Sequence, residues 1–304
     1  MRKFTLAALS AATVVTALAL AGCATGDQAL SGGDAGGSAG EEIIIGSADF
    51  TESQLIGTIY SLALQDAGVK VKEQFNIGSR EVYMAALQDG SIDLIPEYSG
   101  ALLKHLDAES TATTSEDVVA ELADKLPEGV DMYEISEAQD KDILAVTSAT
   151  AEQYDLSTIS DLQPVAGELI LGGPAEWETR VNGVVGLRDV YGLEFKEFLS
   201  LDAGGPLTMT SLLNGQIQVA DVFSTDPALT ANDLVALEDD KSLFAAENVV
   251  PVISAAKSSD TVEKTLNAVS AALTTDALIE MNGKAADGTS LSEIARDWLD
   301  SAGL

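Results

Sequence analysis

Short apolar runs alternate with amphipathic segments along the first part of the chain. The runs that have the length of buried strands lie at 43–46, 69–75 and 92–95. A helix is predicted to begin at Thr51, where Thr51-Glu52-Ser53-Gln54 has capping-box spacing, and to end at Gly68. A second helix is predicted from Gly78-Ser79 to Asp89-Gly90. Strands and helices that alternate over short connections predict a parallel sheet covered on both faces.

The same alternation recurs further along the chain. Strands are predicted at 143–146, 168–171 and 217–222, and helices at 184–191, 207–213, 260–273 and 291–299. Trp298 falls on the apolar side of the last helix, which indicates core packing.

An internal correspondence links the two halves at an offset of 125 residues. Residues 87–99 and 212–224 each contain a helix end, an Asp-Gly or Asn-Gly turn, a strand, and an aromatic residue followed by Ser. The aromatic residues are Tyr98 and Phe223. Open α/β sheets bind ligands outside the carboxyl ends of their strands. The repeat therefore predicts two similar α/β lobes whose aromatic residues face each other across a cleft, although helix-turn-strand units are common enough to match by chance.

Composition narrows the classes of function. The 304 residues include 49 Asp and Glu against 16 Lys and Arg, for a formal net charge of −33, with one Cys and one His. Nucleic acids and anionic lipids require basic binding surfaces, so neither is expected as a partner. One Cys excludes an internal disulfide and a multi-Cys metal site, and His105 alone disfavours His-dependent catalysis. No metal or cofactor is expected.

The first residues have the pattern of a bacterial lipoprotein signal. Basic Arg2 and Lys3 precede an Ala/Leu/Val-rich stretch that ends in Leu-Ala-Gly-Cys at Cys23. Residues 1–22 are therefore predicted to be removed and Cys23 to be lipidated. The small, polar, Gly-rich residues 23–41 are predicted to form a flexible tether.

Several residues after predicted strands are candidates for binding. Ser79 and Thr51 begin helices and could accept an anionic ligand group or act only as helix caps. Arg80 could bind a carboxylate or be a surface charge. The Gly-rich segment 172–180 lacks phosphate-loop spacing, and its Trp177 is predicted to pack within its own lobe.

These segments together carry a family resemblance. GSADFTES, GSREVYMAALQDGSIDLIPEYSG, VFSTDPAL and LVALEDDKSLFAAENVVPVI resemble the osmoprotectant (glycine betaine/choline/carnitine) solute-binding proteins of ABC transporters, the OpuC/ProX-like branch of the type II periplasmic binding fold. The resemblance covers residues 43–304. It implies a two-lobed α/β fold that closes on a ligand in the cleft between the lobes.

The resemblance also implies an aromatic box for a quaternary ammonium group. Tyr98 and Phe223 match two aromatic positions of the box, whereas Asp142 and Glu247 replace two others. Ser53 stands where the family has Gln, and Ala101 where it has Thr. Carboxylates attract cations and accept hydrogen bonds, so we expect a cationic or zwitterionic ligand with donors of its own.

The resulting hypothesis is a lipid-anchored, extracytoplasmic solute-binding protein of an ABC importer, outside the cytoplasmic membrane of a Gram-positive cell. Lobe I is expected at 42–141 and 236–304, and lobe II at 142–235. Tyr98 and Phe223 would sandwich the cation, and Asp142 and Glu247 would complement its charge. Any acidic group of the ligand would meet the helix starts with Glu52, Ser53, Ser79 and Arg80.

A permease and ATPase complex is the expected protein partner, and catalysis is not expected. Three alternatives remain open at this point. They are a binding protein for a polar or basic amino acid-like solute, a lipid-anchored carboxylate-dependent hydrolase, and an adhesin or scaffold that binds no small molecule.

Overall fold

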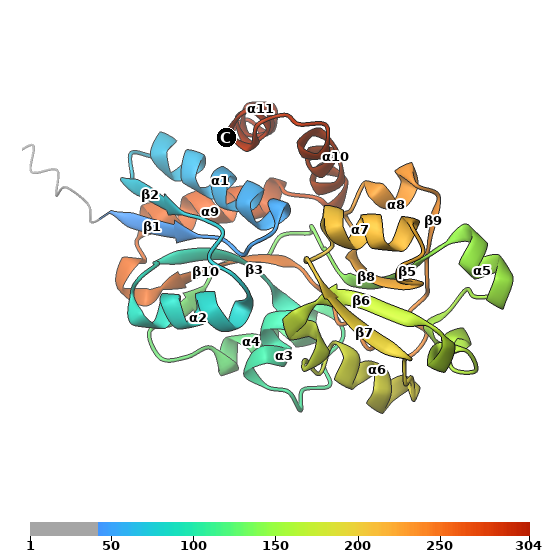
Figure 1. Ribbon diagram of the computed structural model, residues 1–304. Coiled ribbons are helices and arrows are strands. Elements are labelled where there is room, and N and C mark those ends of the chain that lie inside the picture. The colour runs from blue at the N-terminus through green and yellow to red at the C-terminus, as the bar shows by residue number, and fades with distance from the viewer. Residues whose placement is uncertain (1–41) are drawn as a thin grey trace, which may run out of the picture. The chain divides into compact units, whose positions relative to one another are not determined.

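The computed structural model describes residues 42–304, drawn in colour in Figure 1. The predicted signal segment, Cys23 and the predicted tether lie outside these residues. Two five-stranded sheets organise the described chain (Figure 1).

The first sheet has the strand order β2-β1-β3-β10-β4. The strands are β1 (Ile43–Gly46), β2 (Val71–Gln74), β3 (Leu94–Tyr98), β4 (Val130–Met132) and β10 (Val249–Ser254). β1 pairs in parallel with β2 and β3, whereas β10 runs antiparallel to β3 and β4.

The second sheet repeats this arrangement in the order β7-β6-β8-β5-β9. The strands are β5 (Asp142–Thr147), β6 (Ile170–Pro174), β7 (Glu197–Leu201), β8 (Val219–Phe223) and β9 (Leu234–Ala236). β7, β6 and β8 are parallel, and β5 is antiparallel to β8 and β9. The parallel pairing predicted from the strands at 43–46, 69–75 and 92–95 is confirmed for β1, β2 and β3. Each sheet is nevertheless mixed, because its fourth strand belongs to the segment that enters from the other sheet and runs in the opposite direction.

Helices cover the sheets and connect their parallel strands. The α-helices are α1 (Thr51–Asp66), α2 (Arg80–Asp89), α3 (Ser99–Leu106), α4 (Ser115–Lys125), α5 (Ser148–Tyr154), α6 (Val184–Tyr191), α7 (Pro206–Leu213), α8 (Ala228–Ala231), α9 (Asp260–Ala272), α10 (Thr275–Ala286) and α11 (Leu291–Ala302). The short 3₁₀ helices are η1 (Ile159–Leu162), η2 (Ala166–Glu168), η3 (Ala175–Glu178) and η4 (Ala255–Lys257). Over residues 42–304, no helix combines the length and apolar character that crossing a bilayer requires.

The internal repeat is confirmed. β3 and β8 are offset by 125 residues, each occupies the central position of its sheet, and each ends in the predicted aromatic residue. Both strands also pair with the antiparallel strand of their sheet, so that Tyr98 lies opposite Val249 and Phe223 lies opposite Asp142.

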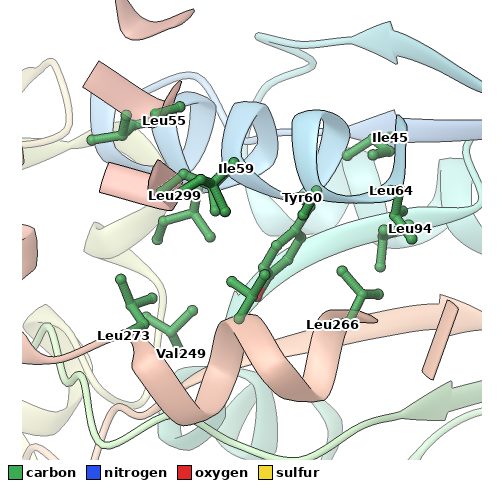
Figure 2. Close-up of a cluster of buried hydrophobic side chains, with 14 of the residues drawn as sticks. Ile45, Leu55, Ile59, Tyr60, Leu64, Leu94, Val249, Leu266, Leu273 and Leu299 are labelled. Carbon is green, nitrogen blue, oxygen red and sulfur yellow. The ribbon is translucent and has the colours of Figure 1, made fainter. Parts of the chain in front are cut away.

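The largest core cluster packs α1 between the first sheet and the C-terminal helices. Leu55, Ile59 and Leu64 of α1 are fully buried against residues of β1, β3, α9 and α11 (Figure 2). α1 ends near Gly68, whose φ of +82° favours glycine. Its start differs from the prediction, because Phe50 is the N-cap and no side chain caps the helix. The capping-box prediction for Thr51 and Gln54 is therefore wrong.

The chain crosses between the sheets twice, at 133–141 and at 237–248. The crossing segments meet at an antiparallel bridge between Gln139 and Asn248. The predicted return to lobe I at Ala236 is too early. Ala236 pairs with β5, and Leu243 and Phe244 still pack in the core of the second sheet. The apolar contacts of these residues keep the segment on lobe II until Phe244.

Candidate functional site

A cavity of about 70 Å³ lies where the ends of β3 and β8 approach the crossing segments. Both sheets and both crossing segments supply its walls. It is lined by Ala48, Asp49, Phe50, Ser79, Arg80, Tyr83, Tyr98, Ala101, Asp140, Asp142, Pro174, Glu176, Trp177, Arg180, Asn182, Ala203, Asp221, Phe223 and Glu247. We call this space the central cavity.

Aromatic rings form one wall of the central cavity. Tyr98 and Phe223 both line it, but the ring of Phe50 lies close to both, with ring-centroid distances of 6.0 Å to Tyr98 and 5.4 Å to Phe223. The three rings therefore form a continuous surface, where the sequence predicted two rings facing each other directly. Phe50 was missed because its position before α1 is typical of an ordinary helix start.

Glu247 and Asp142, which the sequence placed at the ligand, both line the central cavity. Glu247 is 5% exposed, and its Oε2 accepts a hydrogen bond of 2.9 Å from the backbone N–H of Ala101. Burial, with a smaller contribution from the nearby Asp142 carboxylate, raises the pKa of Glu247 to about 8. Asp142 accepts long hydrogen bonds from Trp177 (3.4 Å) and Asn182 (3.2 Å) through one oxygen, and burial raises its pKa.

Asp221, which sequence reasoning missed, is an acid of the second sheet whose side chain has no hydrogen-bond partner among the described residues. It belongs to β8, is 1% exposed, and its Oδ1 is buried with no partner. Burial and the nearby Asp142 raise the pKa of Asp221 well above its usual range. A buried carboxylate without partners is costly to fold, so its place in a cavity indicates a function. The sequence signal that could have identified Asp221 is its position as the one acid in the otherwise apolar strand β8.

The crossing segments contribute Asp140 next to Glu247. The backbone N–H of Asp140 donates to the backbone oxygen of Glu247 at 3.1 Å, so the two acids lie side by side where the lobes join. The Asp140 side chain accepts from Ser224 and from the backbone N–H of Thr225, both of the second lobe. Burial and the nearby Glu52 raise the pKa of Asp140.

Arg80 is buried and already paired. Its Nε and Nη2 donate to the two oxygens of Glu97 at 2.8 Å each, and Tyr83 donates to the same carboxylate at 2.8 Å. Arg80 is 7% exposed and Glu97 is fully buried. The surface-charge alternative for Arg80 is therefore wrong. The bidentate pair occupies the fork of the guanidinium group that a ligand carboxylate would otherwise use.

The other arginine of the central cavity is paired as well. Arg180 makes two hydrogen bonds to Glu81 of α2, at 3.0 and 3.1 Å, and lies 3.9 Å from Glu176. Because Arg180 follows β6 and Glu81 belongs to α2, this ion pair joins the two lobes. Both arginines thus meet acids of the protein, which leaves Asp142, Asp221 and Glu247 without a salt-bridge partner within residues 42–304.

Two of the three remaining predicted residues, Ser53 and Glu52, have structural partners. Ser53 does not line the central cavity, and it accepts a hydrogen bond from the backbone N–H of Ala48 at 2.9 Å. Glu52 lies outside the central cavity, where Tyr98, Thr225 and Asn282 donate to it at 2.7, 2.5 and 2.5 Å. Ser79 lines the central cavity as the N-cap residue of α2, although its side chain makes no capping hydrogen bond.

Trp177 lies in the core of the second lobe and at the wall of the central cavity. It is 1% exposed and its ring stacks on Phe244 at 6.5 Å, which agrees with the predicted packing. Its N–H reaches Asp142. His105 is exposed on α3. In the part of the chain that the structure describes, no three His, Cys, Asp or Glu side chains are grouped so that they could hold a metal ion.

Two similar α/β lobes, joined by two crossing segments with a cavity at the junction, define a two-lobed solute-binding protein. Residues 41–301 match the family model described as the substrate-binding domain of an ABC-type glycine betaine transport system. The chain belongs to this family.

Curated relatives agree with this assignment, and a solved structure shares the fold. The chain is 29% identical over 265 residues to the carnitine transport binding protein OpuCC of Listeria monocytogenes, covering 82% of this chain and 83% of that protein. It is 29% identical over 227 residues to a glycine-betaine-binding protein of Pseudomonas aeruginosa, covering 70% and 71%. A crystal structure titled glycine betaine/carnitine/choline ABC transporter matches with a TM-score of 0.66 at 24% identity over 85% of this chain and 98% of that chain.

The function predicted from sequence is confirmed at the level of the family. The protein is a substrate-binding component of an ABC importer of the glycine betaine, choline and carnitine type. Such components act outside the cytoplasm, bind small solutes and work with a permease and an ATPase, and they are not enzymes.

Proposed function

We propose that this protein captures a small organic cation in the central cavity and prefers it to a zwitterion such as glycine betaine or carnitine. The observation that carries the proposal is Asp221, a buried carboxylate without a partner in the same cavity as the rings of Tyr98, Phe50 and Phe223. A cation on these rings would gain about 0.5–2 kcal/mol from each favourable ring face.

The charges around the central cavity support a cation over a zwitterion. A zwitterion brings a carboxylate, which needs a donor group. The two arginines that could supply one are already bound to Glu97 and Glu81. A ligand carboxylate would also oppose ionisation of Asp142, Asp221 and Glu247, which line the same cavity, whereas a cation would favour it. An amino acid-like solute meets the same difficulty at its α-carboxylate.

Carboxylates also favour ligands that can donate hydrogen bonds. A trimethylammonium group has no N–H, so it would leave the acceptors of Asp221 and Asp142 unpaired. Choline can donate through its hydroxyl, and primary or secondary amines can donate through N–H. Closure of the lobes over such a ligand would be favoured because rings of the first lobe, acids of the second lobe and Glu247 of a crossing segment would contact it at once.

Isothermal titration of the purified protein with choline, glycine betaine, carnitine, ectoine, alkylamines and basic amino acids tests this proposal. We expect choline or an amine to bind at least about tenfold more tightly than glycine betaine, a difference of about 1.4 kcal/mol. Tight binding of glycine betaine without binding of any donor-bearing cation contradicts it.

We also propose that Cys23 is the lipid attachment site that holds the protein at the outer face of the cytoplasmic membrane. The support is the order of basic residues, apolar stretch and Leu-Ala-Gly-Cys in residues 1–23. Metabolic labelling with an alkyne fatty acid should mark the wild-type protein, and Cys23→Ala should remove the label. Equal labelling of both proteins would refute the assignment.

A further inference from the structure

A second cavity, of about 500 Å³, adjoins the central cavity. Asp49, Phe50, Asp140, Ala203 and Phe223 line both spaces. Phe50 and Phe223, with centroids 5.4 Å apart, therefore stand at the boundary between the two spaces. We call this second space the outer cavity.

The outer cavity is acidic. Its lining includes Asp49, Glu52, Asp140, Asp202 and Asp226, and no Lys, Arg or His is among the described residues that line it. A ligand with a negative charge would find no cation there. A cationic group would be favoured both by the local carboxylates and by the acidic central cavity beside it.

Two groups in the outer cavity have unused acceptor capacity. Asp226 makes one hydrogen bond, from the backbone N–H of Ala228 to Oδ1 at 2.8 Å, so its second oxygen has no described partner. Burial and the nearby Glu52 raise the pKa of Asp226. Asn282 donates to Glu52 and Thr225, which leaves its buried Oδ1 without a partner. Since Asp226 directly follows Thr225, the two acceptors lie in one region of the wall.

Asp202 and Glu52, two other acids of the outer cavity, are already occupied. Asp202 accepts from the backbone N–H groups of Leu207 and Thr208 at the start of α7. Glu52 accepts from three side chains. Among the described residues, the free acceptors of the outer cavity are therefore Asp226, Asn282 and the exposed Asp49, and Asp221 is the one in the central cavity that is buried without a partner, with the aromatic boundary between them.

We infer that the outer cavity is a second cation subsite, and that the protein takes an elongated organic cation with two positively charged, hydrogen-bond-donating ends. This inference rests on the proposed function. One end binds among Asp221, Asp142 and Glu247, the apolar middle passes the rings of Phe50 and Phe223, and the other end binds at Asp226 and Asn282. The chemical class is that of aliphatic diamines and polyamines.

Matched pairs of ligands that differ by one amine test the inference. The full-length protein is titrated with putrescine against butylamine and with cadaverine against pentylamine, and choline serves as a probe of the central cavity alone. We expect each diamine to bind at least about tenfold more tightly than its monoamine, because only the diamine reaches both subsites.

Asp226→Asn is the informative variant, because asparagine keeps the oxygen that accepts from Ala228. It should weaken diamine binding by about tenfold and leave monoamine and choline binding within about twofold. Asp49→Asn is a second variant at an exposed residue whose carboxylate has no described hydrogen bond, and it should also reduce the diamine advantage. Asp300→Asn, an exposed change that lines neither cavity, controls for net charge and should have no effect.

The possible outcomes separate the two proposals. Equal binding of diamine and monoamine by the wild type overturns the second subsite, and so does an unchanged diamine advantage in both Asp226→Asn and Asp49→Asn. Choline binding would still support the proposed function in either case. Failure of every cation to bind overturns both proposals.

Discussion

The buried acids of the two lobes differ in how many hydrogen bonds they receive. In the first lobe, Glu97 receives four hydrogen bonds, from Arg80, Tyr83 and the backbone of Tyr98. In the second lobe, Asp221 receives none and Asp142 receives two long ones. A buried charge that is fully paired is a structural element, whereas an unpaired one costs free energy that protonation or a cationic ligand offsets. The buried acid of the first lobe is therefore fixed by the protein's own donors, whereas the buried acids of the second lobe remain available to a ligand.

The largest effect on stability should come from breaking the buried ion pair between Arg80 and Glu97. Glu97→Gln leaves the Arg80 guanidinium buried without a counter-charge, so we expect a loss of about 3–5 kcal/mol in the free energy of unfolding. Urea denaturation of the unliganded protein measures it. A loss below about 1 kcal/mol would mean that the pair behaves like a surface ion pair and that the buried acids of the two lobes do not differ in their contribution to stability.

Asp221→Asn should change ligand affinity much more than it changes stability. Because the carboxylate has no partner to lose, we expect the unliganded stability to change by less than about 1 kcal/mol. Affinity for a small organic cation should fall by about 2 kcal/mol or more, since a buried ionic partner of the ligand is removed. Titration and denaturation of the same sample provide both values. If Asp221→Asn loses stability but keeps its affinity for the cation, Asp221 is a structural group like Glu97 and the contrast between the two lobes is wrong.

Glu247 lies on a crossing segment between the lobes, and it should make both stability and ligand binding depend on pH. Its pKa is about 8 in the folded protein against an ordinary value of 4.5, so the folded state holds the proton more tightly than the unfolded chain does. Its contribution therefore makes the protein less stable as pH rises from about 4.5 to 8. A bound cation favours the ionised form, so binding near pH 7 should release protons and tighten as pH rises.

Titration in two buffers of different ionisation enthalpy measures this proton release. Glu247→Gln removes the group, and the release should decrease in that variant. Asp300→Asn is the matched control for the change in charge. If Glu247→Gln releases as many protons as the wild type, the released protons come from other carboxylates of the central cavity.

The smallest effect should come from the ion pair between the lobes. Arg180 is 20% exposed and Glu81 is 43% exposed, so solvent screens their attraction. Arg180→Gln should change the free energy of unfolding by no more than about 1 kcal/mol. Ligand affinity is the sharper readout: if the pair holds the lobes together, Arg180→Gln and Glu81→Gln should shift it equally. Unequal shifts would show that Arg180 acts on the ligand separately.

Much of the fold could be predicted from local patterns. The helix at 184–191 has the predicted bounds, and β3 and β8 lie where the 125-residue repeat placed them. β10 was missed because a short apolar run does not show which sheet it joins or in which direction it runs. The return to lobe I was placed too early, since Leu243 and Phe244 are assigned to a lobe only by the residues that they contact.

The central cavity was predictable in part. Position-by-position comparison with the family pointed to Tyr98, Phe223, Asp142 and Glu247, and all four line it. It could not show that Phe50 joins the two rings, because that contact depends on how α1 begins. Nor could it distinguish a binding arginine from a paired one at position 80.

The sequence by itself determined the alternation of strands and helices, the twofold repeat and the acidic character of the protein, because periodicity, turn residues and charge are local properties of the chain. The tertiary structure alone decided which acids are satisfied. Glu52 meets a donor 173 residues away at Thr225, and Arg80 meets Glu97, whereas Asp221 meets none. A carboxylate becomes a structural group or a binding group according to the donors that packing places around it, and those donors come from distant segments.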